Sequence, residues 1–208
     1  MKRLLFLCSI LFSQFFYASD FEGKIIYQNS YTTKIPQLSD ARILALLGDR
    51  QDYYYKAGAY KSTTNGTNIQ WQLYVPKDNK VYLKLASSET VLWNNASNQE
   101  DKVLSVTLNK KVVEVLGYMC DELILTCESG VQKYYFNSAI GVDANLFKQH
   151  TYANWWDYMS RAKALPLKMD IETSQFVIHS VAVSVQAMAL EDSFFKLEEG
   201  VKTQENTN

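Results

Sequence analysis

Alternation of apolar and polar residues runs through most of the chain and predicts β-strands. Trp71, Leu73 and Val75 alternate with more polar neighbours, and the pattern returns in 81–85 after a turn at 76–79. This predicts a hairpin with one apolar face and one wetter face. Strands are expected at 21–28, 71–75, 81–85, 118–128, 131–136, 165–173 and 181–187, among about nine to eleven in all.

Two segments depart from the period of two and predict helices. The stretch 37–47 has apolar residues at helical spacing, with Ser39 or Asp40 near its start. A second helix is expected from Asp143 or Asn145 to about residue 164. Within it the apolar residues Tyr152, Trp155, Trp156 and Met159 fall at i, i+3, i+4 and i+7, the stripe of an amphipathic helix.

Strands continue on both sides of each predicted helix, and no linker or repeat divides the chain. The fold class expected is therefore mainly β (α+β), in one domain over residues 19–197. We expect a single, strongly curved antiparallel sheet, an open half-barrel, with helices covering its concave side.

The N-terminus predicts an export signal over residues 1–18. Lys2 and Arg3 precede an apolar run at 4–16, and Ala18-Ser19 offers small residues for cleavage. The run is shorter than the 20 or so residues that span a membrane. Two alternatives are weaker: a buried N-terminal helix, and a lipid anchor on Cys8, which lies inside the apolar run without small residues before it. We expect an exported protein, periplasmic or associated with the outer envelope, and not lipid-anchored.

Composition excludes some classes of protein. Without Lys2 and Arg3, 19 basic residues face 22 acidic ones, which argues against a nucleic-acid partner. A hydrophobic content of 47% with 8 Gly and 3 Pro is typical of a folded domain. The polar end, 198–208, is expected to be a disordered tail.

Cys120 and Cys127 would both remain after processing. They lie seven residues apart in one expected strand, a span of roughly 23 Å. A disulfide requires Cα atoms within about 7 Å. Either the strand bends near Asp121-Glu122, or the two cysteines are small buried side chains, and we expect no intrachain bridge.

No residue set specifies a reaction. There is no G-x-S-x-G elbow, and the two histidines, His150 and His179, lie 29 residues apart without metal-ligand spacing. Asp170 and Glu172 share the polar face of a strand, where solvent exposure is the simpler reading than catalysis. We expect no enzyme activity, no catalytic residue, no metal and no cofactor.

Aromatic residues are the remaining signal, at 13% of the chain with 14 tyrosines. Their enrichment is compatible with ordinary packing between strands, and also with a cavity between sheet and helices that holds a hydrophobic ligand. The residues expected to line or cover such a cavity are Tyr152, Trp155, Trp156, Met159, Trp71 and Leu73.

Several short motifs resemble a family of exported bacterial domains of unknown function. They are Phe-Glu-Gly-x-Ile-x-Tyr at 21–27, Leu-Gly-Tyr-x-Cys at 116–120, Tyr-Tyr-Phe at 134–136, Leu-Pro-Leu-Lys at 165–168 and the acidic, Phe-containing turn at 191–195. That family is similar in fold to the outer-membrane lipoprotein carriers LolA and LolB. The resemblance implies an unclosed, curved sheet whose hollow binds lipid or acylated protein.

Two functions are expected from these observations, and an enzyme stays open as a third class. The first is a periplasmic binding or carrier protein for a lipid, an acyl chain or a lipoprotein-like ligand. The second is a non-catalytic interaction or assembly module that binds an envelope protein or a glycan through an aromatic face.

Overall fold

The structure is a computed structural model that describes residues 20–99 and 101–207. The expected export signal, 1–18, lies outside the described residues. The strands are β1 (Gly23–Thr33), β2 (Arg50–Lys56), β3 (Ala59–Thr64), β4 (Ile69–Val75), β5 (Lys80–Leu85), β6 (Val91–Asn95), β7 (Val103–Val115), β8 (Tyr118–Cys127), β9 (Val131–Gly141), β10 (Ala164–Glu172), β11 (Phe176–Ala187) and β12 (Thr203–Glu205). The helices are α1 (Asp40–Leu47) and α2 (Trp155–Ala162), with 3-10 turns η1 (Ala144–Phe147), η2 (Tyr152–Asn154) and η3 (Asp192–Phe195).

All twelve strands form one sheet, in the order β12-β6-β5-β4-β3-β2-β1-β11-β10-β9-β8-β7. Every pairing is antiparallel except that of β12 with β6. The prediction of a mainly β domain with a single, largely antiparallel sheet is confirmed.

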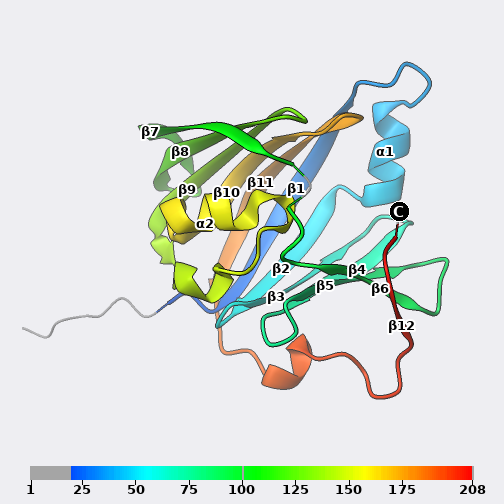
Figure 1. The fold of residues 1–208 in the computed structure, drawn as a ribbon. Helices are drawn as coiled ribbons and strands as arrows, with labels where there is room; N and C mark the ends of the chain where they lie inside the picture. The colour runs from blue at the N-terminus through cyan, green and yellow to red at the C-terminus, as the bar shows by residue number, and fades with distance from the viewer. Residues whose placement is uncertain (1–19, 100, 208) are drawn as a thin grey trace, which may run out of the picture.

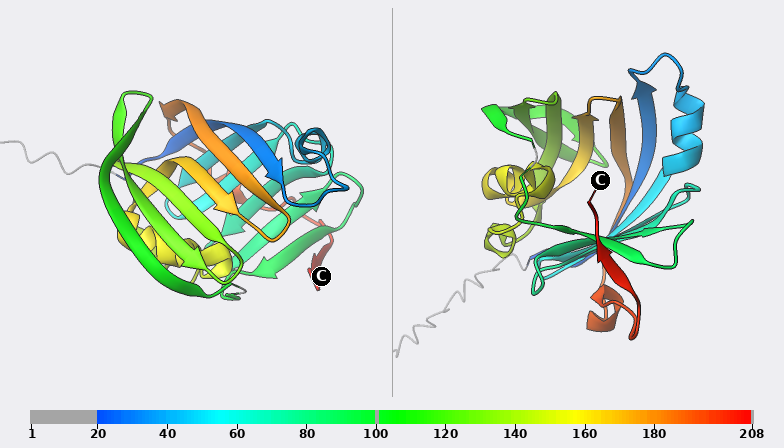
Figure 2. Two further views of the ribbon diagram at one scale, coloured as in Figure 1. Left: turned by 90° about the horizontal axis from the view of Figure 1, so that it is seen from above. Right: turned by 45° about the vertical axis from the view of Figure 1, so that its right-hand side comes forward.

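The sheet is open, and it is not strongly curled as the sequence led us to expect. Its edges, β7 and β12, lie at opposite ends of the strand order. The strands from β7 to β11 run in a different direction from those of β2 to β6 (Figures 1 and 2). Right-handed twist accumulates from strand to strand in a long sheet, and it produces this change of direction without closing the sheet.

The two faces of the sheet are covered by different segments. On one face, which we call the inner face, α2 packs against β8, β9 and β10, and η1 packs against α2 (Figure 1). On the outer face, η3 packs against β3 and β4. The larger core cluster lies on the inner face, and a smaller one, centred on Leu73, Tyr82, Val91 and Phe195, lies on the outer face.

Helix α1 agrees with its prediction. Its N-cap is Ser39, whose hydroxyl accepts a hydrogen bond from the backbone N–H of Arg42, 3.3 Å away. Its one fully buried residue is Ile43.

The second predicted helix is broken into three pieces, which corrects the expectation of one helix from Asp143 or Asn145 to about 164. Asp143 caps η1, but Ala153 and Asn154 have left-handed φ values of 53° and 59°. The break has a local cause, because the backbone N–H groups of Thr151 and Tyr152 both donate to the Ala96 carbonyl instead of to a helical partner. Only 155–162 then continues as α-helix.

The C-terminal segment also differs from the expected disordered tail at 198–208. Here β12 pairs with β6, and the N–H of Asn206 donates to the Trp93 carbonyl. Val201 packs against the outer cluster. Polar composition did not reveal this, because strand pairing uses backbone groups that every residue except proline carries.

Cys120 and Cys127 are both free and buried, so no disulfide joins them, as expected. Burial raises the pKa of the Cys127 thiol to about 11, and the side-chain amide of Asn154 donates to its sulfur over 3.3 Å. Strand β8 runs without interruption through both residues.

Candidate functional site

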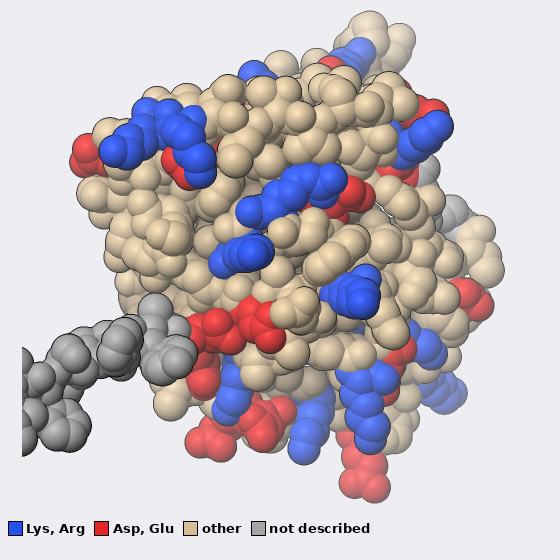
Figure 3. Space-filling view, turned by 60° about the vertical axis from the view of Figure 1, so that its left-hand side comes forward, with Lys and Arg blue, Asp and Glu red and all other residues tan. Residues whose placement is uncertain are grey.

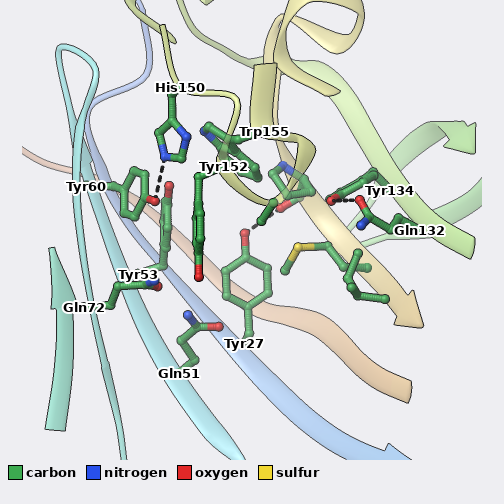
Figure 4. Close-up of a pocket in the computed structure, with 14 residues that line it drawn as sticks. Tyr27, Gln51, Tyr53, Tyr60, Gln72, Gln132, Tyr134, His150, Tyr152 and Trp155 are labelled. Carbon is green, nitrogen blue, oxygen red and sulfur yellow. Dashed lines mark hydrogen bonds between the residues drawn. The ribbon is translucent and has the colours of Figure 1, made fainter. Parts of the chain in front are cut away.

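A hollow lies between the inner face of the sheet and the segment η1–α2 (Figure 4). Its volume is about 240 Å³. It is lined by Tyr27, Gln51, Tyr53, Tyr60, Gln72, Gln132, Tyr134, His150, Tyr152, Ala153, Trp155, Pro166, Met169 and Ile171. We call it the aromatic hollow.

A second hollow of about 280 Å³ adjoins the first. The two share Gln51, Gln72, Met169 and Ile171 as walls, so they are neighbouring compartments on one face of the sheet. The second compartment is also lined by Asn29, Tyr31, Leu47, Ser62, Thr64, Ile69, Leu83, Ile178 and Ser180. Small-molecule pockets commonly measure about 300–1,000 Å³, a range that the two compartments reach together.

Strand register explains why polar and aromatic groups meet here. Successive side chains of a strand point to opposite faces, so alternate residues share a wall. Asn29 of β1 lies opposite Ser180 of β11, and Ser62 of β3 lies opposite Gln72 of β4. These pairs form a polar strip across the middle of the inner face.

An array of stacked rings forms one wall of the aromatic hollow. Tyr53 stacks on Tyr60 with ring centroids 5.4 Å apart, and Tyr60 stacks on Tyr74 at 5.3 Å. His150 lies 4.3 Å from the Tyr74 ring, and Trp155 meets Tyr60 edge-on at 6.2 Å. Figure 4 shows Tyr53 and Tyr60 from the sheet converging with His150 and Trp155 from the η1–α2 segment. Aromatic pairs of this kind fix the shape of a wall.

The hollow is electrically neutral. Neither compartment has an Asp, Glu, Lys or Arg in its lining. His150 is 1% exposed, and burial lowers its pKa to about 3, so the ring is uncharged at neutral pH. Its Nε2 is 3.0 Å from the Tyr60 hydroxyl, and burial raises the pKa of Tyr60 well above the ordinary value.

Four buried polar atoms in these walls have no hydrogen-bond partner within the described part of the chain. They are Tyr53 Oη, His150 Nδ1, Trp155 Nε1 and Asn29 Oδ1. The first three belong to the aromatic hollow, and Asn29 belongs to the second compartment. Leaving a buried donor or acceptor unpaired costs about 1–3 kcal/mol. The walls therefore hold hydrogen-bonding capacity that the fold does not use.

The six predicted site residues are divided between the two faces of the sheet. Tyr152 and Trp155 line the aromatic hollow. Trp156 packs partly buried against the inner core, and Met159 is fully buried within it. Trp71 and Leu73 belong to the outer cluster.

The face of β4 that meets the hollow carries the residues that alternate with Trp71 and Leu73. Gln72 faces the hollow, and Tyr74, whose ring stacks on Tyr60, lies in the inner core. The period of two correctly separated the faces of β4, but the C-terminal segment buries the apolar one from outside. Alternation alone does not tell which face meets the helices.

The sequence also contained a signal for Tyr27, Asn29 and Tyr31 of β1. They alternate with Gln28, Ser30 and Thr32, which places all three on one wall. These three residues are not among those that the sequence predicted to line the hollow. The alternation shows that they share a face, but only the neighbouring strands and helices show which face of a central strand lines the hollow.

The outer face carries a separate polar network. His179 Nδ1 is 2.7 Å from Asp170 Oδ1, and its Nε2 is 3.3 Å from the Thr32 hydroxyl. Glu172 pairs with Lys34 at 2.6 Å, and this hydrogen bond holds the pKa of the Glu172 carboxyl below its usual value. None of these side chains borders either compartment. Asp170, which is also 3.6 Å from Lys168 Nζ, and Glu172 thus have ionic partners on the polar face where they were expected.

No cluster of His, Cys, Asp and Glu in the described residues could hold a metal ion. Among the same residues no helix has both the length and the hydrophobicity needed to cross a membrane.

No family model matches the chain, and no curated protein is significantly similar to it. Among solved structures, the chain is similar to the crystal structure of PNGF-II, with 15% sequence identity and a TM-score of 0.49. The likeness covers 89% of this chain and 32% of that one, so this chain spans about a third of the length of PNGF-II.

Proposed function

We propose that this chain is a non-catalytic binding protein that holds a neutral, largely hydrophobic ligand in the aromatic hollow. The observation that carries the proposal is a lining of aromatic, aliphatic and amide side chains without a charged residue. A charged ligand would lose its hydration there without gaining an ionic partner, which is costly. A neutral ligand meets no such penalty.

The shape of the site favours a ligand with an apolar body and a polar group. Engineered apolar cavities of about 150 Å³ bind benzene, so about 240 Å³ holds a somewhat larger apolar group. Polar atoms of the ligand would meet the unpaired groups of Tyr53, His150 and Trp155. An acyl chain with a neutral head, whose head lies in the aromatic hollow and whose chain reaches the second compartment, has this combination.

The proposed setting is the bacterial envelope. It is supported by the expected export signal at 1–18 and by the resemblance in sequence motifs to the exported family related in fold to LolA and LolB. An exported carrier would meet lipids and lipoproteins in transit. The carrier role and the relationship to LolA and LolB are part of this proposal.

The alternative, an interaction module that uses an exposed aromatic face, has less support from the arrangement of the rings. Tyr60 and Tyr74 are buried against His150 rather than displayed. On the outer face Trp71 and Trp93 are partly buried and lie beneath Lys61 and Lys80.

A charge placed in the lining tests the proposal. Gln72→Glu keeps the size of a side chain shared by both compartments and adds a carboxylate. We expect the affinity for a fluorescent neutral acyl probe to fall by at least about tenfold, the equivalent of roughly 1.4 kcal/mol. Gln186→Glu on β11, outside both compartments, is the matched control and should bind as the unaltered protein does.

Native mass spectrometry of protein purified from the envelope provides the second measurement. We expect an adduct of lipid size that the Gln72→Glu variant lacks. If the unaltered protein carries no adduct and takes up no acyl probe, or if Gln72→Glu binds normally, the hollow is not the binding site.

A further inference from the structure

One edge of the sheet is long, and no other strand of the described residues covers it. Within residues 20–99 and 101–207, strand β7 has 13 residues and pairs only with β8, whereas the opposite edge, β12, has three residues (Figure 1). An edge strand presents unpaired backbone N–H and C=O groups, which soluble proteins usually shorten, charge or cover.

The edge is apolar on its inner face. Leu104, Val106 and Leu108 are 57%, 37% and 47% exposed. The residues of β8 opposite Val106 and Leu108 are Leu125 and Leu123, at 0% and 1% exposed. The apolar inner face that α2 covers over β8, β9 and β10 therefore continues onto the edge strand β7. Figure 3, which brings this side forward, shows a largely tan surface with blue and red groups scattered over it.

The sequence of the edge has no built-in protection. Residues 103–109 contain no charge and no proline and are mostly β-branched or apolar. Segments of this kind aggregate when left exposed on an edge. Protection begins only at Lys110 and Lys111, where the pairing with β8 is irregular and Lys111 has a φ of 56°.

The stretch from Ser105 to Asn109 is complementary to itself. It pairs with β8 without irregularity and lies between two interruptions. In an antiparallel, two-fold pairing centred on Thr107, Thr107 meets its own copy, Ser105 meets Asn109, and Val106 meets Leu108. Apolar residues then oppose apolar ones on the inner face and polar residues oppose polar ones on the outer face.

We propose that β7 pairs with β7 of a second copy of this chain, across the two-fold axis at Thr107. The pairing supplies hydrogen-bond partners to the unpaired backbone N–H and C=O groups of β7. It also covers Val106 and Leu108 of both copies. It closes as a dimer because each copy has one such edge and the lysines at 110 and 111 end the regular stretch.

Sedimentation of the processed chain at micromolar concentrations tests the pairing. The unaltered protein should sediment as a dimer and Val106→Lys as a monomer, because an inward-facing charge on an edge prevents strand addition. Val183→Lys, at a residue 52% exposed on central strand β11, is the matched control and should remain dimeric. Circular dichroism checks that each variant is folded. A monomeric unaltered protein, or a folded, dimeric Val106→Lys, overturns the proposal.

Cysteine cross-linking tests the register. Directly opposed residues of an antiparallel pair have Cα atoms about 4.5–5.5 Å apart, within disulfide range, whereas the Val106 pair would be diagonal neighbours at about 7–8 Å. Oxidised Thr107→Cys should run as a covalent dimer and Val106→Cys should not. Absence of the Thr107→Cys dimer, or a dimer of Val106→Cys in its place, overturns the two-fold pairing at Thr107.

Discussion

His150 lies against Tyr60 and Tyr74 in the wall of the aromatic hollow, and burial keeps its ring uncharged. At the level of single residues, the hollow depends on such uncharged polar groups. Gln51, Gln72 and Asn29 contribute amides, and none of them has an ionic neighbour in the lining. A histidine held in this way makes the stability of the fold dependent on pH.

The pKa of His150 is about 3 in the folded chain and 6.5 when exposed. The unfolded chain therefore binds one more proton between these values, and the free energy of unfolding falls as pH decreases from about 6.5 towards 3, by on the order of 4 kcal/mol in total. His150→Asn, which does not titrate, should flatten this dependence in urea denaturation. His179→Asn, which removes the histidine beside Asp170 on the outer face, serves as the comparison. An unchanged slope in His150→Asn would show that other groups produce the dependence.

At the scale of elements, the segment after β11 covers the outer face of β4. Phe195 of η3 is 6% exposed and packs in the cluster that contains Leu73, Tyr82 and Val91. This cover is the reason that the second face of β4 is not solvated and that the aromatic hollow can use the Gln72 side of the strand.

Phe195→Ala should lower the free energy of unfolding by about 3–5 kcal/mol, the usual cost of truncating a buried Phe. Met188→Ala, at a residue 44% exposed in the same segment, should change it by less than about 0.5 kcal/mol. Chemical denaturation measures both. A loss at Phe195 no larger than that at Met188 would indicate that the segment does not pack on the sheet in solution.

For the whole molecule, the aromatic hollow and the β7 edge are separate sites. Neither compartment is lined by a residue of β7 or β8. We therefore expect Val106→Lys to abolish dimerisation while leaving the affinity for the acyl probe within about twofold, because sites without shared contacts behave additively. Gln72→Glu should have the opposite pattern, with normal sedimentation and weakened binding. A loss of both properties in either variant would show that the sites are coupled.

The sequence by itself determined the class of fold and much of its element order. The period of two in 71–75, 165–173 and 181–187 marks strands that the structure contains, and the capping residue Ser39 marks α1. These features are local: strand alternation and helix capping depend on residues a few positions apart. The absence of a bridge between Cys120 and Cys127 also followed from local geometry.

Only the tertiary structure decided which face of each strand lines the hollow, and how open the sheet is. Gln72 and Trp71 are neighbours in sequence, yet one faces the hollow and the other faces the C-terminal segment. That choice depends on η3 and β12, more than 100 residues away. The break at Ala153 likewise follows from hydrogen bonds of Thr151 and Tyr152 to the distant Ala96. Contacts at such separations leave no periodic signal in the chain, because each is made by a single pairing of strands or a single carbonyl.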